Sequence, residues 1–273
     1  MLLLFGLFLI SYSTVAIYIS NISQTYVVNE YDSNVSSLKK SEISSIKEKA
    51  NSFNNSLTDN VSTSNSERKT EYAFSVGEIE GYITIPKIRV VLPIYEGTRE
   101  TILNKGVGHI SSTSLPIGGK STHCVLTGHS AYPTSTLFND LDLLKVGDLF
   151  YIKCLDEVYT YKIDKIMIKE KSVADRYIKI QKNKDYCSLI TCTPKTVNSH
   201  RLIVRGERVI GENKASVNKI INTVIADKEN GQRIVFFIVL SLALVILIII
   251  IMLIRKKLKR RDDNASEKNK AIN

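Results

Sequence analysis

The 273-residue sequence lacks the histidine and cysteine spacings that would indicate a zinc protein. It contains four residues of each type, and none of them form a Cys-x-x-Cys or His-x-x-x-His pair. Zinc sites usually use such spacings, so we expect neither a metal nor another cofactor. The chain also lacks basic patches interleaved with aromatic residues, which are typical of nucleic-acid binding. Its net charge of +10 therefore does not indicate a nucleic-acid partner.

Charge is also absent from the N-terminal segment. Residues 1–29 carry no charged side chain, and residues 2–19 are long and apolar enough to span a bilayer as a helix. A cleaved signal peptide is the alternative, but a basic n-region and a clear small-x-small cleavage site are missing. We therefore predict a retained membrane anchor at residues 1–20, followed by a polar stem at residues 21–76 that holds a candidate lid region. Within this stem, residues 41–51 suggest a modest helix and residues 60–66 a linker.

A second apolar run, at residues 234–254, is uncharged and is followed by a basic cluster at residues 255–261. From Arg255 onward there are eight basic and three acidic residues, which leaves 29 basic and 24 acidic residues elsewhere. The positive-inside rule places residues 255–273 in the cytoplasm, where they contact anionic membrane lipid. Residues 214–233 would be a juxtamembrane segment. Two spans put the intervening domain outside the cell membrane, so we predict a two-pass membrane protein.

Short runs rich in β-forming residues dominate the region between the spans, at residues 77–213. Such runs, separated by turn signals, favour a closed, mostly β barrel. Short helices are predicted at residues 100–105 and 136–144, and a further helix at residues 216–227 with Ser216 as a candidate N-cap. The predicted strands cover residues 81–88, 90–95, 122–128, 148–155, 159–168, 186–193 and 202–210.

Three residues of catalytic type lie where predicted strands end or begin. Cys192 ends the run at residues 186–193, Arg201 precedes the next run, and His129 follows the run at residues 122–128. A thiolate is the nucleophilic form of cysteine, and an imidazole can stabilise it and later protonate a leaving amine. A guanidinium can stabilise an oxyanion. The set suits acyl transfer, although a core cysteine and a surface arginine would show the same pattern.

The motifs around these residues resemble the signature of sortases, the cysteine transpeptidases of Gram-positive surfaces. They read Leu-Thr-Gly-His at residues 126–129, Leu-Ile-Thr-Cys-Thr-Pro at residues 189–194 and Arg-Leu-Ile-Val-Arg-Gly at residues 201–206. Flanking stretches at residues 81–88, 106–109, 118–121 and 137–142 are similar to those of the class C, pilus-assembling branch. The resemblance runs from about residue 81 to residue 206 and implies a mostly antiparallel, eight-stranded sortase barrel.

The resemblance also implies a reaction and its partners. Cys192 would attack a Leu-Pro-x-Thr-Gly-like sorting signal on a surface or pilin protein, and His129 would protonate the leaving amine. Arg201, backbone N–H groups near Thr193 and the neighbouring Thr191 would contact the oxyanion or the substrate. The acceptor amine would be a pilin lysine in pilus assembly, or a peptidoglycan cross-bridge or lipid II in a housekeeping-type enzyme. An inactive, membrane-tethered binding module on the same barrel is the alternative from another class.

The stretch before the barrel departs from the class C pattern. Class C sortases usually carry a lid that an Asp-Pro-aromatic motif anchors in the cleft, and the five prolines, at residues 86, 93, 116, 133 and 194, leave none for such a motif. The segment Tyr-Ala-Phe at residues 72–74 is the substitute candidate. Because residues 51–66 are rich in serine and asparagine and offer little apolar surface, we predict a cleft that is mostly open in the resting enzyme.

The remaining histidines and cysteines have ordinary interpretations. We predict that His109 and His123 make structural hydrogen bonds and that His200 is solvated. The strand pattern predicts that the side chains of three cysteines lie in the core, although a disulfide between them stays open at this stage: Cys124, Cys154 and Cys187.

Overall fold

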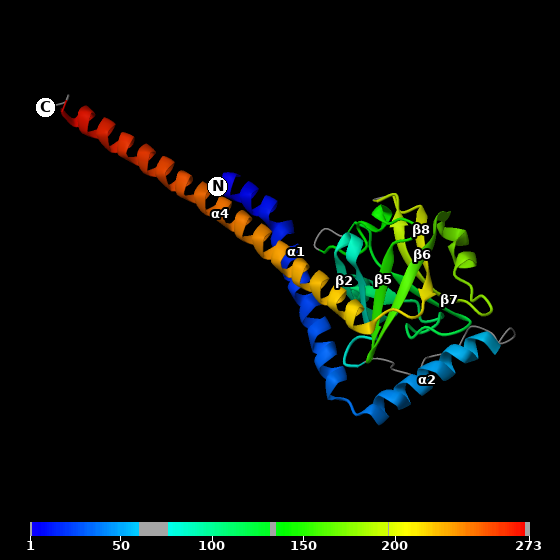
Figure 1. Cartoon of the computed structure of the whole chain (residues 1–273). Helices are drawn as coiled ribbons and strands as arrows, with labels where there is room; N and C mark the ends of the chain where they lie inside the picture. Colours follow the sequence, from blue (N-terminus) through cyan, green and yellow to red (C-terminus); the bar gives the residue numbers. More distant parts are fainter. Residues whose placement is uncertain (1, 60–75, 132–134, 196, 271–273) are drawn as a thin grey trace.

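The computed structural model describes residues 2–59, 76–131, 135–195 and 197–270. A closed β-barrel forms the body of the protein, helices α1 and α4 lie along one side of it, and α2 lies beneath it (Figure 1). These helices span Leu2–Ser37 (α1), Lys40–Asp59 (α2) and Lys214–Lys270 (α4).

The barrel closes through eight strands in the order β1-β2-β3-β4-β7-β8-β6-β5. Two neighbouring pairs, β2–β3 and β4–β7, are parallel, and the other pairs in the barrel are antiparallel. The prediction of a mostly antiparallel, eight-stranded barrel is therefore confirmed. The strands are β1 (Gly81–Ile85), β2 (Val90–Glu96), β3 (Val107–His109), β4 (Thr122–Thr127), β5 (Leu149–Cys154), β6 (Glu157–Glu170), β7 (Asp185–Thr193) and β8 (His200–Val209).

Several element boundaries differ from the sequence-based prediction. The strand predicted at residues 81–88 ends at Ile85, because Pro86 starts the 3-10 turn η1 (Pro86–Ile88). Strand β3 was not predicted, since it is only three residues long and lies beside glycines. The helix predicted at residues 136–144 is reduced to the 3-10 turn η2 (Leu141–Leu143). The predicted helix at residues 100–105 is α3 (Glu100–Leu103), and a second unpredicted turn is η3 (Lys171–Tyr177).

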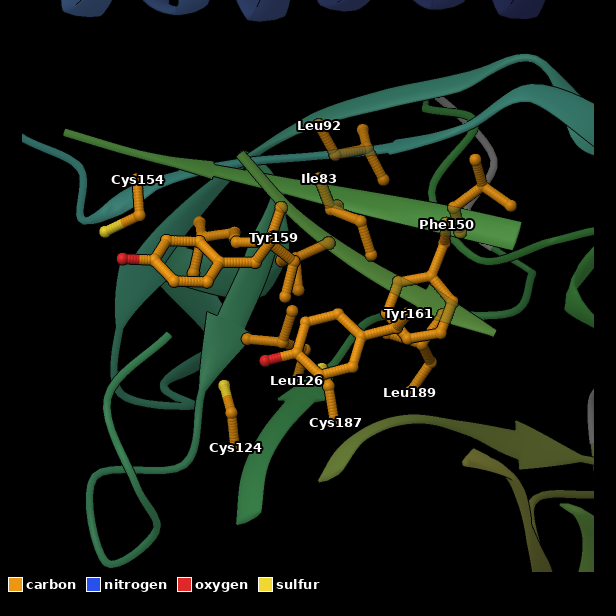
Figure 2. Close-up of a cluster of buried hydrophobic side chains, with 14 of the residues drawn as sticks. Ile83, Leu92, Cys124, Leu126, Phe150, Cys154, Tyr159, Tyr161, Cys187 and Leu189 are labelled. Atoms are coloured by element: carbon orange, nitrogen blue, oxygen red, sulfur yellow. The ribbon is translucent and has the colours of Figure 1, made fainter. Parts of the chain in front are cut away.

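The core fills the barrel with side chains from alternate strand positions. Ile83 lies opposite Leu92 on β2 and opposite Ile152 on β5, and Phe150 lies opposite Tyr161. Figure 2 shows these rings among aliphatic side chains from the facing strands. Cys124, Cys154 and Cys187 are buried in or beside this core, as predicted, and all three are free thiols, which answers the open question of a disulfide.

Strands β1, β2 and β5 also bury their outer faces, because α1 and α4 cover them. Tyr31 of α1 shows how closely the helix docks: its hydroxyl donates to the Glu80 carbonyl (3.1 Å) and accepts from the Leu155 N–H (2.7 Å). The second half of α1 lies in the predicted polar stem, so this part of the stem is integrated with the barrel. The outer cluster comprises Val28, Tyr31, Val35, Ile79, Tyr82, Val91, Tyr95, Tyr151, Val217, Ile221 and Val224.

Helix α2 docks on the barrel, although the serine- and asparagine-rich sequence of residues 51–66 predicted little apolar surface for holding this segment down. Ala50 is buried in the barrel core cluster, and Phe53 packs against it. The Asn54 side chain is 2% exposed and binds the Leu115 backbone twice, accepting from its N–H (2.8 Å) and donating to its carbonyl (3.4 Å). A single well-placed amide thus docks a segment whose composition resembles a linker. Residues 60–75, which include Tyr72 and Phe74, lie outside the described residues, so the lid question stays a prediction.

Helix α4 is one continuous helix from the barrel through the predicted span. Its first turn is capped by Asn213, whose side-chain oxygen accepts from the N–H of Ala215 (2.9 Å), so the candidate cap Ser216 was wrong. Among the residues whose side chains the structure describes, one helix, α4, is long and apolar enough to cross a membrane, over Lys214–Lys257. α4 projects far beyond the barrel, and the first part of α1 lies beside it (Figure 1). The rings of Tyr18 and Phe236 are stacked there, with 4.3 Å between their centroids.

Candidate active site

The ends of β4 and β7 place His129 and Cys192 at one level of the barrel. These strands pair in parallel, and Thr127 lies opposite Ile190, so the residues two further along each chain are His129 and Cys192. Two hydrogen bonds continue the pairing past β4. The Gly128 N–H donates to the Ile190 carbonyl (3.1 Å), and the Thr191 hydroxyl donates to the Gly128 carbonyl (2.7 Å). Thr191 is therefore buried and fixes the ends of the two strands relative to each other.

Arg201 lies opposite Cys192 in the antiparallel β7–β8 register. Its Nη1 donates to the carbonyl of Asn198 in the preceding loop (3.1 Å) and to that of His200, the first residue of β8 (3.0 Å). The structure thus brings Cys192, His129 and Arg201 to one end of three adjacent strands, with the guanidinium held against its own loop.

A cleft of about 270 Å³ opens at this end of the barrel, and Cys192 lies in its wall. Cys192 is partly exposed, whereas the other three thiols are buried. Burial raises the pKa of both the Cys124 and the Cys154 thiol well above the usual value for cysteine, so these two side chains stay in the unreactive thiol form. Cys192 is thus the thiol that an external reagent can reach. The lining residues are Ser130, Phe138, Asn139, Asp142, Thr191, Cys192, Thr193, Pro194, Lys195 and Leu202.

The backbone around His129 is held by packing and by a return hydrogen bond. The Phe138 N–H donates to the His129 carbonyl (2.9 Å), and a Cβ atom at Gly128 would lie 3.0 Å from the buried Phe138 ring. A glycine before the histidine therefore allows this close packing. Sequence reasoning missed Glu100 of α3, whose Oε1 lies 3.4 Å from His129 Nε2. An exposed glutamate in a short helix gives no signal in the sequence that it faces a residue 29 positions away.

The other histidines have separate roles. His109 is buried and pairs with Glu80 (Nδ1 to Oε2, 3.0 Å), and His123 is buried between the Lys179 carbonyl (3.0 Å) and the Ser188 hydroxyl (2.8 Å). Burial lowers the pKa of His123. Both are structural, as predicted. His200 is partly exposed and bonds to the Ser199 hydroxyl beside it (2.8 Å). Within the described ranges, no three histidine, cysteine or acidic side chains come together as metal ligands.

Comparisons with known proteins agree on one family. A family model described as the sortase domain matches residues 83–209. Sortase D of Bacillus subtilis is 32% identical over 151 residues, which is 54% of this chain and 73% of the relative. The crystal structure of sortase C of Streptococcus pneumoniae is 41% identical, with a TM-score of 0.63, and the match covers 68% of this chain and 97% of that one. Sortase C1 of Streptococcus agalactiae is 39% identical at the same TM-score, covering 68% and 100%. The chain belongs to the sortase family of cysteine transpeptidases.

Proposed function

We propose that the protein is a class C-type sortase that joins sorting-signal proteins to an amine through Cys192. The observation that carries this proposal is the parallel register of β4 and β7, which brings His129 level with Cys192 at a cleft, together with the pairing of Cys192 and Arg201. A core cysteine would be buried, whereas Cys192 is open to the cleft. An inactive binding module would have no need of this set.

In the first half-reaction, the Cys192 thiolate attacks the carbonyl carbon of the threonine in a Leu-Pro-x-Thr-Gly-like signal. A C–S bond forms, and the carbonyl electron pair moves onto oxygen. The tetrahedral intermediate collapses with cleavage of the C–N bond to glycine, and the His129 imidazolium supplies the proton for the departing amine. The products are a thioester on Cys192 and a free C-terminal fragment.

In the second half-reaction, an acceptor amine attacks the thioester carbonyl. Neutral His129 takes the proton from the attacking nitrogen, a new amide bond forms, and the C–S bond breaks to restore the thiolate. Arg201 supports both steps as an oxyanion donor, together with backbone N–H groups near Thr193. Because the Arg201 guanidinium donates to the Asn198 and His200 carbonyls in this structure, it has to exchange these contacts for the oxyanion when substrate binds.

We propose a pilin lysine as the acceptor amine. The support is similarity. The motifs at residues 81–88 and 137–142 resemble the pilus-assembling branch, and the solved sortase C structures that match this chain are 36–41% identical to it. The crystal structure of the Streptococcus pneumoniae sortase C gives insight into pilin substrate specificity, which is a property of that protein.

We also propose a two-pass topology with the barrel outside the membrane. The far ends of α1 and α4 project to the same side of the barrel, and their stacked residues Tyr18 and Phe236 hold the helices together there (Figure 1). A basic cluster follows the apolar run of α4, so the positive-inside rule assigns this side to the cytoplasm.

The test offers purified full-length enzyme a sorting-signal peptide with two acceptors at equal concentration, a lysine-containing pilin domain and a peptidoglycan cross-bridge peptide. We expect an isopeptide-linked pilin product by mass spectrometry, and none with Cys192→Ala. Preferential transfer to the cross-bridge peptide would assign a wall-anchoring enzyme instead. Absence of any acyl product with either acceptor would contradict the transpeptidase proposal.

A further inference from the structure

A buried polar cluster joins helices α1 and α4 to the chain segments on both sides of His129. Its central residue is Gln24 of α1, which is 3% exposed. Gln24 Nε2 donates to the Ser135 hydroxyl (3.0 Å) and to the Lys105 carbonyl (3.4 Å). The Ser20 hydroxyl donates to the same Ser135 hydroxyl (2.9 Å). We call Ser20, Gln24, Ser135 and Lys228 the helix–loop cluster.

Helix α4 fixes the orientation of the Gln24 amide. Lys228 Nζ donates to Gln24 Oε1 (3.3 Å) and to the Val91 carbonyl of β2 (2.9 Å), and the lysine is buried. Since the amide oxygen faces an ammonium group, the amide NH₂ has to face Ser135 and Lys105. A buried ammonium group is unfavourable unless its hydrogen bonds are made, so its two acceptors hold the lysine in place. Through Lys228, α4 therefore holds α1 against strand β2 of the barrel, in addition to forming the predicted membrane span.

The contacts of Gln24 lead to His129 along two short routes. On one side, Ser135 lies three residues before Phe138, whose N–H binds the His129 carbonyl. On the other side, Lys105 follows α3, which carries Glu100 at 3.4 Å from the His129 ring. One amide group on α1 therefore holds both segments that border the histidine, although it lies more than 80 residues from either in the sequence.

We propose that Gln24 is a positioning residue for His129, and that the α1–α4 pair is part of the catalytic apparatus as well as the membrane anchor. The inference rests on the proposed roles of His129 and Cys192. Loss of the amide frees Ser135 and Lys105 to shift, and the imidazole shifts with them. Displacement of a catalytic group by about 1 Å can lower a rate by about 100-fold. A partial displacement should therefore lower kcat by about tenfold, while the part of the cleft wall that β7, β8 and the loop between them form keeps its position.

The experiment uses full-length enzyme in detergent micelles and two readouts. The first is turnover of a quenched fluorescent peptide containing Leu-Pro-Glu-Thr-Gly, with a lysine amide as the acceptor. The second needs no substrate: it is the rate at which iodoacetamide alkylates Cys192 at neutral pH, which follows the thiolate that the imidazole stabilises. The variants are Gln24→Leu, Ser135→Ala and the double variant. Asn29→Leu, on an exposed face of α1, is the matched control, and thermal melts report folding.

We expect Gln24→Leu and Ser135→Ala each to lower kcat about tenfold with KM within about twofold, and to slow alkylation about fivefold. The kcat of the double variant should fall no more than about twofold below that of the less active single variant, because both changes remove the same Gln24–Ser135 contact. Ser135→Ala is a small truncation and keeps the test decisive if Gln24→Leu fails to fold. Asn29→Leu should have the kcat and the alkylation rate of wild type.

Two results would overturn the inference. One is wild-type kcat and alkylation in both single variants, and the other is losses that multiply in the double variant, as expected for independent packing defects. If Cys192→Ala retained turnover, the proposed function would fail instead, which is a separate outcome. Lys228→Met should reproduce the loss through the α4 contact, while Lys219→Met, at an exposed position of α4, should not.

Discussion

Raising the pH from about 6 to about 9.5 should destabilise the barrel through one buried ion pair, His109 with Glu80. Both side chains are almost completely buried, 1% and 3% exposed, and His109 Nδ1 lies 3.0 Å from Glu80 Oε2. His109 Nε2 is held by the Ser114 carbonyl (3.0 Å). The imidazolium is thus enclosed by an anion and a carbonyl, and its deprotonation removes the attraction that offsets burial of the carboxylate.

The magnitude follows from the pKa of His109. Burial alone lowers this pKa, but the charge and the hydrogen bond of Glu80 outweigh burial and raise it from 6.5 to about 9. Since one pKa unit corresponds to 1.36 kcal/mol, the raised pKa means that protonation of His109 contributes about 3 kcal/mol to stability. The folded-state pKa is the higher one, so this contribution is complete below about pH 6.5 and is lost as the pH rises through about 9.

Urea unfolding of the full chain in micelles, followed by circular dichroism at a series of pH values, measures this loss. Glu80→Gln is the control, since it removes the charge and retains the shape. Its unfolding free energy should be lower near pH 6 and should change much less between pH 6.5 and 9. If wild type and Glu80→Gln lost stability in parallel across this range, the reasoning about the pair would be refuted.

Substitutions at three positions test the site and α2. Arg201→Ala should lower kcat by at least about 100-fold, and the kcat of Arg201→Lys should lie between those of Arg201→Ala and wild type, because lysine keeps the charge but lacks the planar fork. Equal kcat values in all three enzymes would show that Arg201 takes no part in the mechanism. Asn54→Ala should lower the unfolding free energy by about 2 kcal/mol, since it leaves the buried Leu115 N–H without its acceptor, whereas exposed Asn55→Ala should have no measurable effect in the same melt. Glu100→Gln should change kcat/KM less than about fivefold, because the Glu100 side chain is 69% exposed and such pairs contribute at most about 1 kcal/mol; a 100-fold loss would show that the carboxylate takes part in the chemistry.

The barrel was predictable because most of its strands alternate in the way that a half-buried or closed sheet requires. Residues 186–193, for example, are rich in β-branched and apolar residues and are followed by Pro194. They form β7 with nearly the predicted bounds. The same alternation correctly placed Cys124 and Cys187 in the core and Cys192 at a strand end. β3 lacked this signal, since its three residues depend on β2 and β4 for their pairing.

What the sequence could not reveal was which polar residues become buried on docking. Asn54 and Gln24 look like surface amides, and their burial depends on partners 61 and 111 residues away, Leu115 and Ser135. Glu100 gave no signal for the same reason. Pairings of this kind follow from the relative placement of helices and barrel, which local patterns do not encode. The serine- and asparagine-rich composition of residues 51–66 therefore gave no sign that residues 51–59 dock on the barrel as part of α2.

Trapping the acyl enzyme tests the central claim most directly. Full-length enzyme is mixed with a peptide containing Leu-Pro-Glu-Thr-Gly in the absence of an acceptor amine, quenched in acid, digested and analysed by mass spectrometry. We predict a mass increase equal to the peptide up to threonine, on Cys192 alone, which added lysine amide discharges and which is absent from Cys192→Ala. Acylation of another residue, or an adduct that persists in Cys192→Ala, would contradict the account.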